Sequence, residues 1–209
     1  MKHVEENNQE LLKDINLFVQ RYEKIGNPRK ALFSSYSEIE MSPTTARYIK
    51  VLSDLEILFG SLEGMDIVEI GGGYGGLATV IETKYKFNSY YNIDLKEAAE
   101  LSEKYCSENN VENFFAIPPE NVRSAFEGKN IDLVISNYAF SECNTETQDI
   151  YIKHIFDVSR MGYVTHNTHP DRADRVRQIV KKYDHFLDYG TDLSRKNHPI
   201  ITWGSKKRG

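Results

Sequence analysis

The chain has 209 residues, a length that suits one domain with a small appendage and that can bury a substantial core. Its formal net charge of -5 at pH 7, without a basic stripe, gives no support to a nucleic-acid partner. The sequence has neither a signal-peptide pattern nor an apolar stretch near the roughly 18 residues of a membrane span, so we expect a cytoplasmic protein without membrane insertion.

The N-terminal part of the chain predicts helices. An apolar stripe with intervals of three and four residues covers 11–25 and indicates an amphipathic helix. A second helix is expected to begin after Ser42, an N-cap residue followed by proline, and to end at Gly60. We expect a helical extension, acting as a lid, over 1–62 and the main domain over 63–209.

From Met65 onward, short β-rich runs alternate with helical stretches, which is typical of a parallel sheet with crossover helices. The last two runs are joined without helical periodicity and should pair as an antiparallel hairpin. The expected fold class is α/β, with a Rossmann-like, seven-stranded, mostly parallel sheet, this C-terminal hairpin and helices on both faces. The expected strands are 66–70, 89–94, 113–117, 131–137, 162–166, 185–189 and 199–203. The expected helices between them are 77–86, 96–109, 120–126, 145–160 and 171–183.

A glycine cluster follows the first of these strands. Gly71, Gly73 and Gly76 have the G-x-G-x-x-G spacing that dinucleotide and S-adenosylmethionine sites share. Glu69 would repel a pyrophosphate, but it would attract the sulfonium and ammonium groups of S-adenosylmethionine. Asp94 ends the next strand, where an acid accepts hydrogen bonds from ribose hydroxyls. We therefore expect S-adenosyl-L-methionine as the cofactor and S-adenosyl-L-homocysteine as the product. The predicted cofactor-binding residues are Glu69, Gly71, Gly72, Gly73, Tyr74, Gly75, Asp94, Leu95, Ser136 and Asn137.

The end of the fourth expected strand holds candidates for the chemistry. Ser136, Asn137 and Tyr138 lie where a cofactor methyl group would meet its acceptor. Tyr138 is a candidate for both catalysis and substrate binding, and Glu142 is a second catalytic candidate. Two alternatives stay open: Tyr138 as packing in the cleft, and Glu142 as an acid favoured by a helix N-terminus.

Two imidazoles and a carboxylate follow the fifth expected strand. His166 or His169 could accept the proton of a hydroxyl during methyl transfer, because the ordinary pKa of histidine lies near 6.5. Together with Asp171 they could instead bind a divalent metal that acidifies the hydroxyl. Solvated histidines and a helix-capping Asp171 are the plain alternative. The predicted site contains no metal, and the two cysteines lack the spacing of a zinc site.

Three blocks of the sequence, 42–54, 69–77 and 136–142, resemble in the same order a family of sugar O-methyltransferases from bacterial polysaccharide and natural-product gene clusters. These are class I S-adenosylmethionine-dependent methyltransferases, so the resemblance implies that 63–209 is a methyltransferase domain. The resemblance implies the cofactor site described above and an acceptor site roofed by the N-terminal helices. The implied acceptor-site residues are Tyr36, Ser42 and Thr45.

The sequence therefore predicts transfer of a methyl group to a hydroxyl of a sugar or sugar-nucleotide, in surface (capsular) polysaccharide or natural-product biosynthesis. One alternative is methylation of a nitrogen or of a phosphate-type (phosphoramidate) oxygen on a capsule modification. Others are an NAD-dependent oxidoreductase and a non-catalytic protein that binds S-adenosylmethionine. The expected partner is a small carbohydrate or nucleotide-sugar, and a homodimer is compatible with the sequence.

Overall fold

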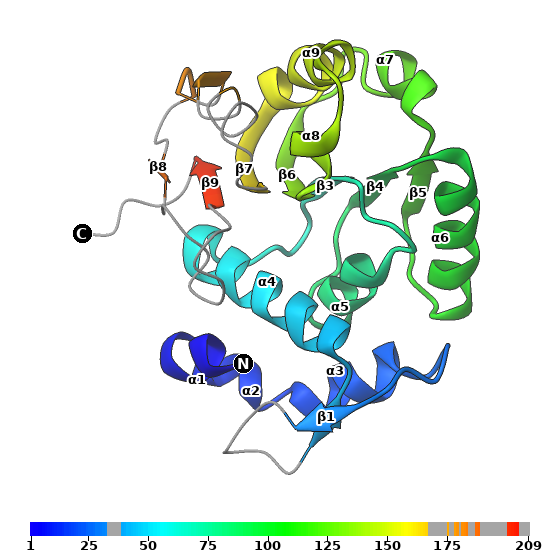
Figure 1. Cartoon of the computed structure of the whole chain (residues 1–209), viewed down its shortest axis with the longest axis vertical. Helices are drawn as coiled ribbons and strands as arrows, with labels where there is room; N and C mark the ends of the chain where they lie inside the picture. The colour runs from blue at the N-terminus through cyan, green and yellow to red at the C-terminus, as the bar shows by residue number, and fades with distance from the viewer. Residues whose placement is uncertain are drawn as a thin grey trace.

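The computed structural model of the chain describes residues 1–32, 39–166, 175, 178, 179, 181–183, 187, 188 and 200–204. A central sheet lies between two sets of helices (Figure 1), with α1 to α5 on one side and α7 to α9 on the other. The helices are α1 (Lys2–Asn7), α2 (Gln9–Leu12), α3 (Ile15–Tyr22), α4 (Pro43–Phe59), α5 (Gly76–Lys84), α6 (Lys96–Glu108), α7 (Val122–Ala125), α8 (Ala139–Glu142) and α9 (Thr145–His154), with 3-10 turns η1 (Pro119–Asn121) and η2 (Phe156–Val158).

The larger sheet has the strand order β5-β4-β3-β6-β7-β9-β8. Its strands are β3 (Asp66–Ile70), β4 (Ser89–Ile93), β5 (Phe114–Ile117), β6 (Ile131–Asn137), β7 (Ser159–Thr165), β8 (Leu187–Asp188) and β9 (Ile200–Trp203). Strands β3 to β7 are parallel, whereas β9 is antiparallel to both β7 and β8. The Rossmann-like α/β class with a mostly parallel sheet is thus confirmed. The order reverses between β3 and β6, so a crevice is expected at the carboxyl ends of these two strands.

The N-terminal helices differ from the sequence prediction. The apolar stripe over 11–25 is not one helix, because the chain turns at Lys13 and Asp14 between α2 and α3. The short hairpin of β1 (Ala31–Leu32) and β2 (Glu40–Met41) was not predicted. Helix α4 begins and ends where the capping residues indicated, since Ser42 Oγ accepts a hydrogen bond from Thr45 N at 3.1 Å and Gly60 follows with a φ of 86°.

The predicted helix 145–160 is too long. Helix α9 ends at His154, and β7 already begins at Ser159, which pairs with Ile131 of β6. The buried Phe156 lies in the 3-10 turn η2 between them. The tertiary pairing with β6 therefore overrides the helical pattern at the end of this segment. The predicted helix 171–183 lies mostly outside the described residues.

Each face of the sheet packs on its own hydrophobic cluster. One cluster joins the sheet to the N-terminal helices, α4, α5 and α6 and includes Phe18, Leu52 and Ile81. The other joins it to α7, α8 and α9 and includes Phe140 and Trp203. The N-terminal helices thus share a core with the sheet. None of the described helices combines the length and the apolar composition needed to cross a bilayer.

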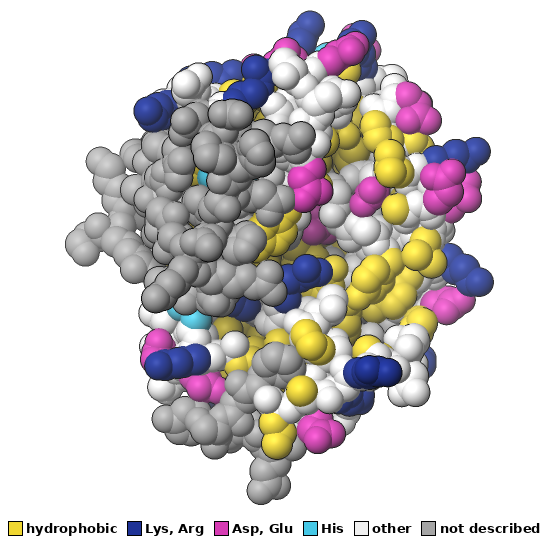
Figure 2. Space-filling view, in the orientation of Figure 1, with side chains coloured by type: hydrophobic (Ala, Val, Ile, Leu, Met, Phe, Trp, Pro, Cys, Tyr) yellow, Lys and Arg dark blue, Asp and Glu magenta, His cyan; other side chains and the backbone are white. Residues whose placement is uncertain are grey.

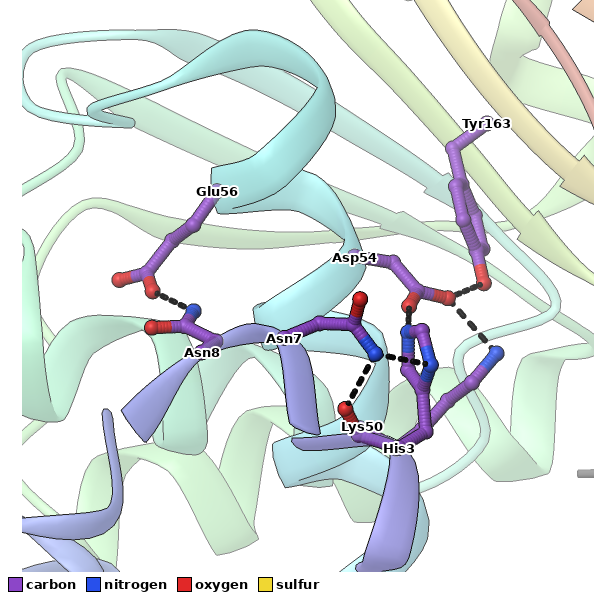
Figure 3. Close-up of polar contacts among 7 residues, drawn as sticks. All are labelled: His3, Asn7, Asn8, Lys50, Asp54, Glu56 and Tyr163. Carbon is purple, nitrogen blue, oxygen red and sulfur yellow. Dashed lines mark hydrogen bonds and ion pairs between the residues drawn. The ribbon is translucent and has the colours of Figure 1, made fainter. Parts of the chain in front are cut away.

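A buried polar group, the Asp54 cluster, joins α1, α4 and β7 (Figure 3). It consists of His3, Lys50, Asp54 and Tyr163. One carboxylate oxygen of Asp54 lies 3.2 Å from His3 Nε2, and the other accepts from Lys50 Nζ and from the Tyr163 hydroxyl, each at 2.7 Å. The side chains of Lys50 and Asp54 are each only 8% exposed. A single carboxylate therefore links three elements that are far apart in the sequence.

Candidate functional site

The glycine turn, residues 71–75, connects β3 to α5 at the crevice. Gly71, Gly73 and Gly75 have φ values of 75°, 58° and 84°, in the left-handed region that favours glycine. A Cβ added to Gly71 would overlap Ala139 at the start of α8. A Cβ added to Gly73 would meet no atom within 4 Å. The backbone of the turn is therefore packed against α8 on one side and open to a ligand at Gly73.

Two polar side chains, Asn92 on β4 and Asp94 just after this strand, hold the turn in place. Asn92 accepts a hydrogen bond from Gly72 N and donates one to Gly73 O, both at 3.1 Å. Asp94 accepts from Gly73 N at 2.7 Å and from Leu95 N at 2.8 Å. Because a carboxylate has about four acceptor positions, Asp94 can still bind ribose hydroxyls. The sequence prediction missed Asn92, although an amide within the apolar run before Asp94 was a signal for it.

Glu69 lies under the glycine turn and is 2% exposed. Its Oε2 accepts a hydrogen bond from the Tyr90 hydroxyl at 2.7 Å, and a Cβ on Gly72 would overlap the carboxylate. Burial raises the pKa of Glu69 to about 7, although the Tyr90 and Asn137 side chains and the Arg47 guanidinium act to lower it. The Asn137 Nδ2 atom is buried and has no hydrogen bond of normal geometry to the described residues. Glu69 and Asn137 thus bring a titratable acid and an amide to the carboxyl ends of β3 and β6.

The ends of β6 and β7 lie beside the turn. Ser136 Oγ donates to Ile70 O at 3.3 Å and accepts from Phe140 N at 3.0 Å, so it joins β3 to the start of α8. Tyr138 is half-buried and has a φ of 75°, which is rare outside glycine. Its backbone N donates to Thr165 O at 2.8 Å, and the buried His166 follows directly. The backbones of Tyr138 and His166 are thereby placed at the same edge of the sheet.

Four tyrosines pack around the glycine turn. The hydroxyls of Tyr22 on α3 and Tyr74 in the turn are hydrogen-bonded to each other. The Tyr105 ring on α6 lies edge-on to Tyr74, with centroids 5.0 Å apart. Tyr48 on α4 lies edge-on to Tyr22, with centroids 5.7 Å apart. The N-terminal helices therefore contact the turn directly, which local sequence patterns did not indicate.

Two of the acceptor-site candidates, Ser42 and Thr45, also have structural roles. Both are buried, Ser42 caps α4, and the Thr45 hydroxyl donates to Glu23 Oε1 at 2.6 Å. A contact of either residue with an acceptor stays a prediction. Glu142 is exposed at the end of α8.

Some predicted residues lie outside the described part of the chain, namely Tyr36, His169 and Asp171. The described residues contain no group of three or more His, Cys, Asp or Glu side chains that could hold a metal ion. Figure 2 shows hydrophobic side chains gathered on the part of the surface that carries α6 and β5. Leu95, directly before α6, is 68% exposed. An exposed apolar residue next to Asp94 suits contact with the flat face of an adenine ring.

A glycine turn at the point where the strand order reverses, with a buried acid before it and a second acid after the next strand, defines a class I S-adenosylmethionine-dependent methyltransferase. The residues fit this cofactor: the turn is open at Gly73, and Glu69 is an acid suited to its cationic groups. The chain belongs to the methyltransferase small domain family, whose model matches residues 34–161.

Solved structures agree on the fold. A Thermoplasma acidophilum protein is 16% identical with a TM-score of 0.55, and the match covers 93% of this chain and 98% of that one. An rRNA methylase from Streptococcus thermophilus is 16% identical with a TM-score of 0.54, covering 82% and 97%. A SAM-dependent methyltransferase from Aquifex aeolicus is 16% identical with a TM-score of 0.52, covering 75% and 96%. A comparison with curated protein sequences gives no significant match.

Cofactor affinity is expected to increase with pH around neutrality. Glu69 has a pKa of about 7 in the free protein, and the ammonium group of a bound cofactor favours the carboxylate, so binding below pH 7 should release a proton. We expect the Kd for S-adenosylhomocysteine to fall roughly tenfold between pH 6 and pH 8. The Glu69→Gln variant should bind weakly at both pH values. Isothermal titration calorimetry in buffers of different ionisation enthalpy measures the Kd and the released proton.

The raised pKa of Glu69 also affects the stability of the free folded protein, and this effect has the opposite dependence on pH. The raised pKa means that the free folded protein holds this proton more tightly than the unfolded chain. Glu69 therefore contributes stability at low pH that is lost as the pH rises through about 7.

For the binding experiment, a Kd that is equal at pH 6 and pH 8, without proton release, would contradict the assignment of Glu69 to the cofactor.

Proposed function

We propose that this methyltransferase transfers the methyl group to a hydroxyl of a sugar or sugar-nucleotide, with His166 as the general base. The observation that carries the proposal is the position of His166. It follows β7 directly, beside Tyr138 and Asn137 at the end of β6, on the edge of the sheet that carries the glycine turn. A base at this point is close to where donor and acceptor would meet.

The bound cofactor supplies an electrophilic methyl carbon on a sulfonium. His166 would accept the proton of the acceptor hydroxyl during attack on that methyl group. Glu69 would hold the cationic end of the donor, and Asp94 would hold its ribose. Fixing donor and acceptor in attack geometry provides much of the rate, and a general base contributes typically 10²- to 10⁴-fold.

Two features support a small carbohydrate as the acceptor. The three sequence blocks over 42–54, 69–77 and 136–142 resemble sugar O-methyltransferases. The net charge of -5 disfavours a long polyanion such as RNA. The N-terminal helices form one wall of the acceptor cleft in this proposal and act as its lid. The division of the chain at 62/63 and a contact of Tyr36 or Tyr138 with the acceptor stay predictions.

Methyl transfer is tested with methyl-labelled S-adenosylmethionine and a panel of nucleotide-sugars, free sugars and RNA. We expect label on a hydroxyl of a nucleotide-sugar or sugar. We also expect calorimetric binding of S-adenosylhomocysteine but not of NADH, because Glu69 beside the turn repels a pyrophosphate. Label in RNA alone would overturn the carbohydrate assignment. Tight S-adenosylhomocysteine binding without transfer to any member of the panel would also count against it.

A further inference from the structure

Arg47 lies on α4 close to the glycine turn. Its guanidinium carbon is 5.1 Å from the centroid of the Tyr48 ring, a cation–π arrangement. The Tyr48 ring also packs against the start of α5, where a Cβ on Gly76 would come within 2.7 Å of Tyr48 Cε2. Tyr48 therefore contacts both the guanidinium and the residue that ends the G-x-G-x-x-G pattern.

Arg47 is exposed and makes no ion pair within the part of the chain that the structure describes. Arg21, Arg160 and Arg175 each pair with a carboxylate. Arg29 and Arg123 resemble Arg47, since neither makes an ion pair among the described residues. The Arg47 guanidinium nevertheless acts on the site, since its positive charge helps to lower the pKa of the buried Glu69. A buried acid under Gly72 and an exposed cation on Tyr48, which contacts Gly76, thus lie along the same glycine turn and the start of α5.

The combination of an acid and a cation, Glu69 and Arg47, matches the methionine portion of the cofactor. The methionine portion of S-adenosylmethionine carries an ammonium and a carboxylate on the same carbon atom, so its recognition requires an anion and a cation at neighbouring positions. Glu69 supplies the anion for the ammonium. Arginine is suited to the carboxylate because its planar guanidinium can donate two parallel hydrogen bonds to it.

We propose that Arg47 binds the carboxylate of the cofactor's methionine portion, opposite Glu69, which holds the ammonium. The proposal rests on the S-adenosylmethionine site described above. It adds a specificity-determining residue from α4, outside the glycine turn and the strand ends.

The test compares two ligands that differ only in this carboxylate: S-adenosylmethionine and decarboxylated S-adenosylmethionine. Calorimetric Kd values are measured for the wild type, Arg47→Gln, Arg47→Lys and Glu69→Gln. Arg47→Gln should weaken S-adenosylmethionine binding by roughly 10- to 100-fold and change binding of the decarboxylated ligand by less than about twofold. Arg47→Lys should lie between the wild type and Arg47→Gln for S-adenosylmethionine. Glu69→Gln should weaken both ligands, since both retain the ammonium.

Arg160→Gln is the matched control. It makes the same substitution at an exposed arginine at the start of β7. The glycine turn lies at the other end of the strands, so both Kd values should stay unchanged. Equal weakening of both ligands by Arg47→Gln, or no weakening of either, overturns the proposal. An unchanged S-adenosylmethionine Kd with a raised KM for the acceptor also overturns it and assigns the guanidinium to an anionic group of the acceptor. A wild type that binds neither ligand would instead refute the cofactor site itself.

Discussion

Replacing His166 with alanine is expected to lower kcat by roughly 10²- to 10⁴-fold and to leave the Kd for S-adenosylhomocysteine nearly unchanged. A neutral sugar hydroxyl is a poor nucleophile until its proton is removed, so loss of the base should slow the chemical step. The proposed cofactor-binding residues lie on β3, after β4 and in the glycine turn, and the hydrogen bonds that position them do not involve His166. The measurement is single-turnover methyl transfer to the sugar or nucleotide-sugar that accepts label.

His169→Ala and His154→Ala serve as companions. His169 is the second candidate base. His154 is the control and lies at the end of α9. We expect His166→Ala to lose turnover while His154→Ala keeps it. Full turnover in both the His166 and the His169 variants would contradict a histidine base. It would favour an acceptor that needs less help with deprotonation, such as a nitrogen or a phosphate-type oxygen.

Asp54→Asn is expected to destabilise the fold by roughly 3–5 kcal/mol, because it removes the carboxylate of a buried ion pair while the Lys50 charge stays buried. In this variant Lys50 would remain 7% exposed without its carboxylate, and the contacts to His3 and Tyr163 would weaken. Urea denaturation followed by circular dichroism measures the free energy of unfolding.

Glu100→Gln is the matched control for this substitution. It removes one carboxylate of an exposed pair, in which Lys96 Nζ lies 4.0 Å away and both side chains are well exposed, so it should cost less than about 1 kcal/mol. A second variant, Lys50→Met with Asp54→Leu, removes both charges and should be more stable than Asp54→Asn alone. An Asp54→Asn protein as stable as Glu100→Gln would mean that the Asp54 cluster does not hold α1, α4 and β7 together.

Local patterns in the sequence were sufficient for much of the fold. The bounds of β3 and β6 match the predicted 66–70 and 131–137, because each is a short β-rich run with a clear end. Helix α4 was also placed correctly, since Ser42 and Gly60 determine its ends through their own backbone geometry. The break between α2 and α3 was missed because the apolar spacing continues across it.

The sequence also predicted the part of the site whose residue types depend on local backbone geometry. The glycine turn could be recognised because left-handed φ values restrict the residue type to glycine. The partners of Glu69 could not be predicted in this way, since Tyr90 is 21 residues away and reaches it only across neighbouring strands. Asp54 and Tyr163 are 109 residues apart. Contacts of this kind depend on the tertiary arrangement and have no local signal.

The hydrogen bond between Tyr22 and Tyr74 has a consequence for how this enzyme can diverge. Tyr74 belongs to the glycine turn inside the family's shared region, 34–161, whereas Tyr22 lies before that region begins. Substitutions in the first 33 residues can therefore change the surroundings of the glycine turn while the shared region 34–161 keeps its own sequence. Natural variation or protein engineering in the N-terminal segment can therefore adjust the glycine turn without any change in the shared region.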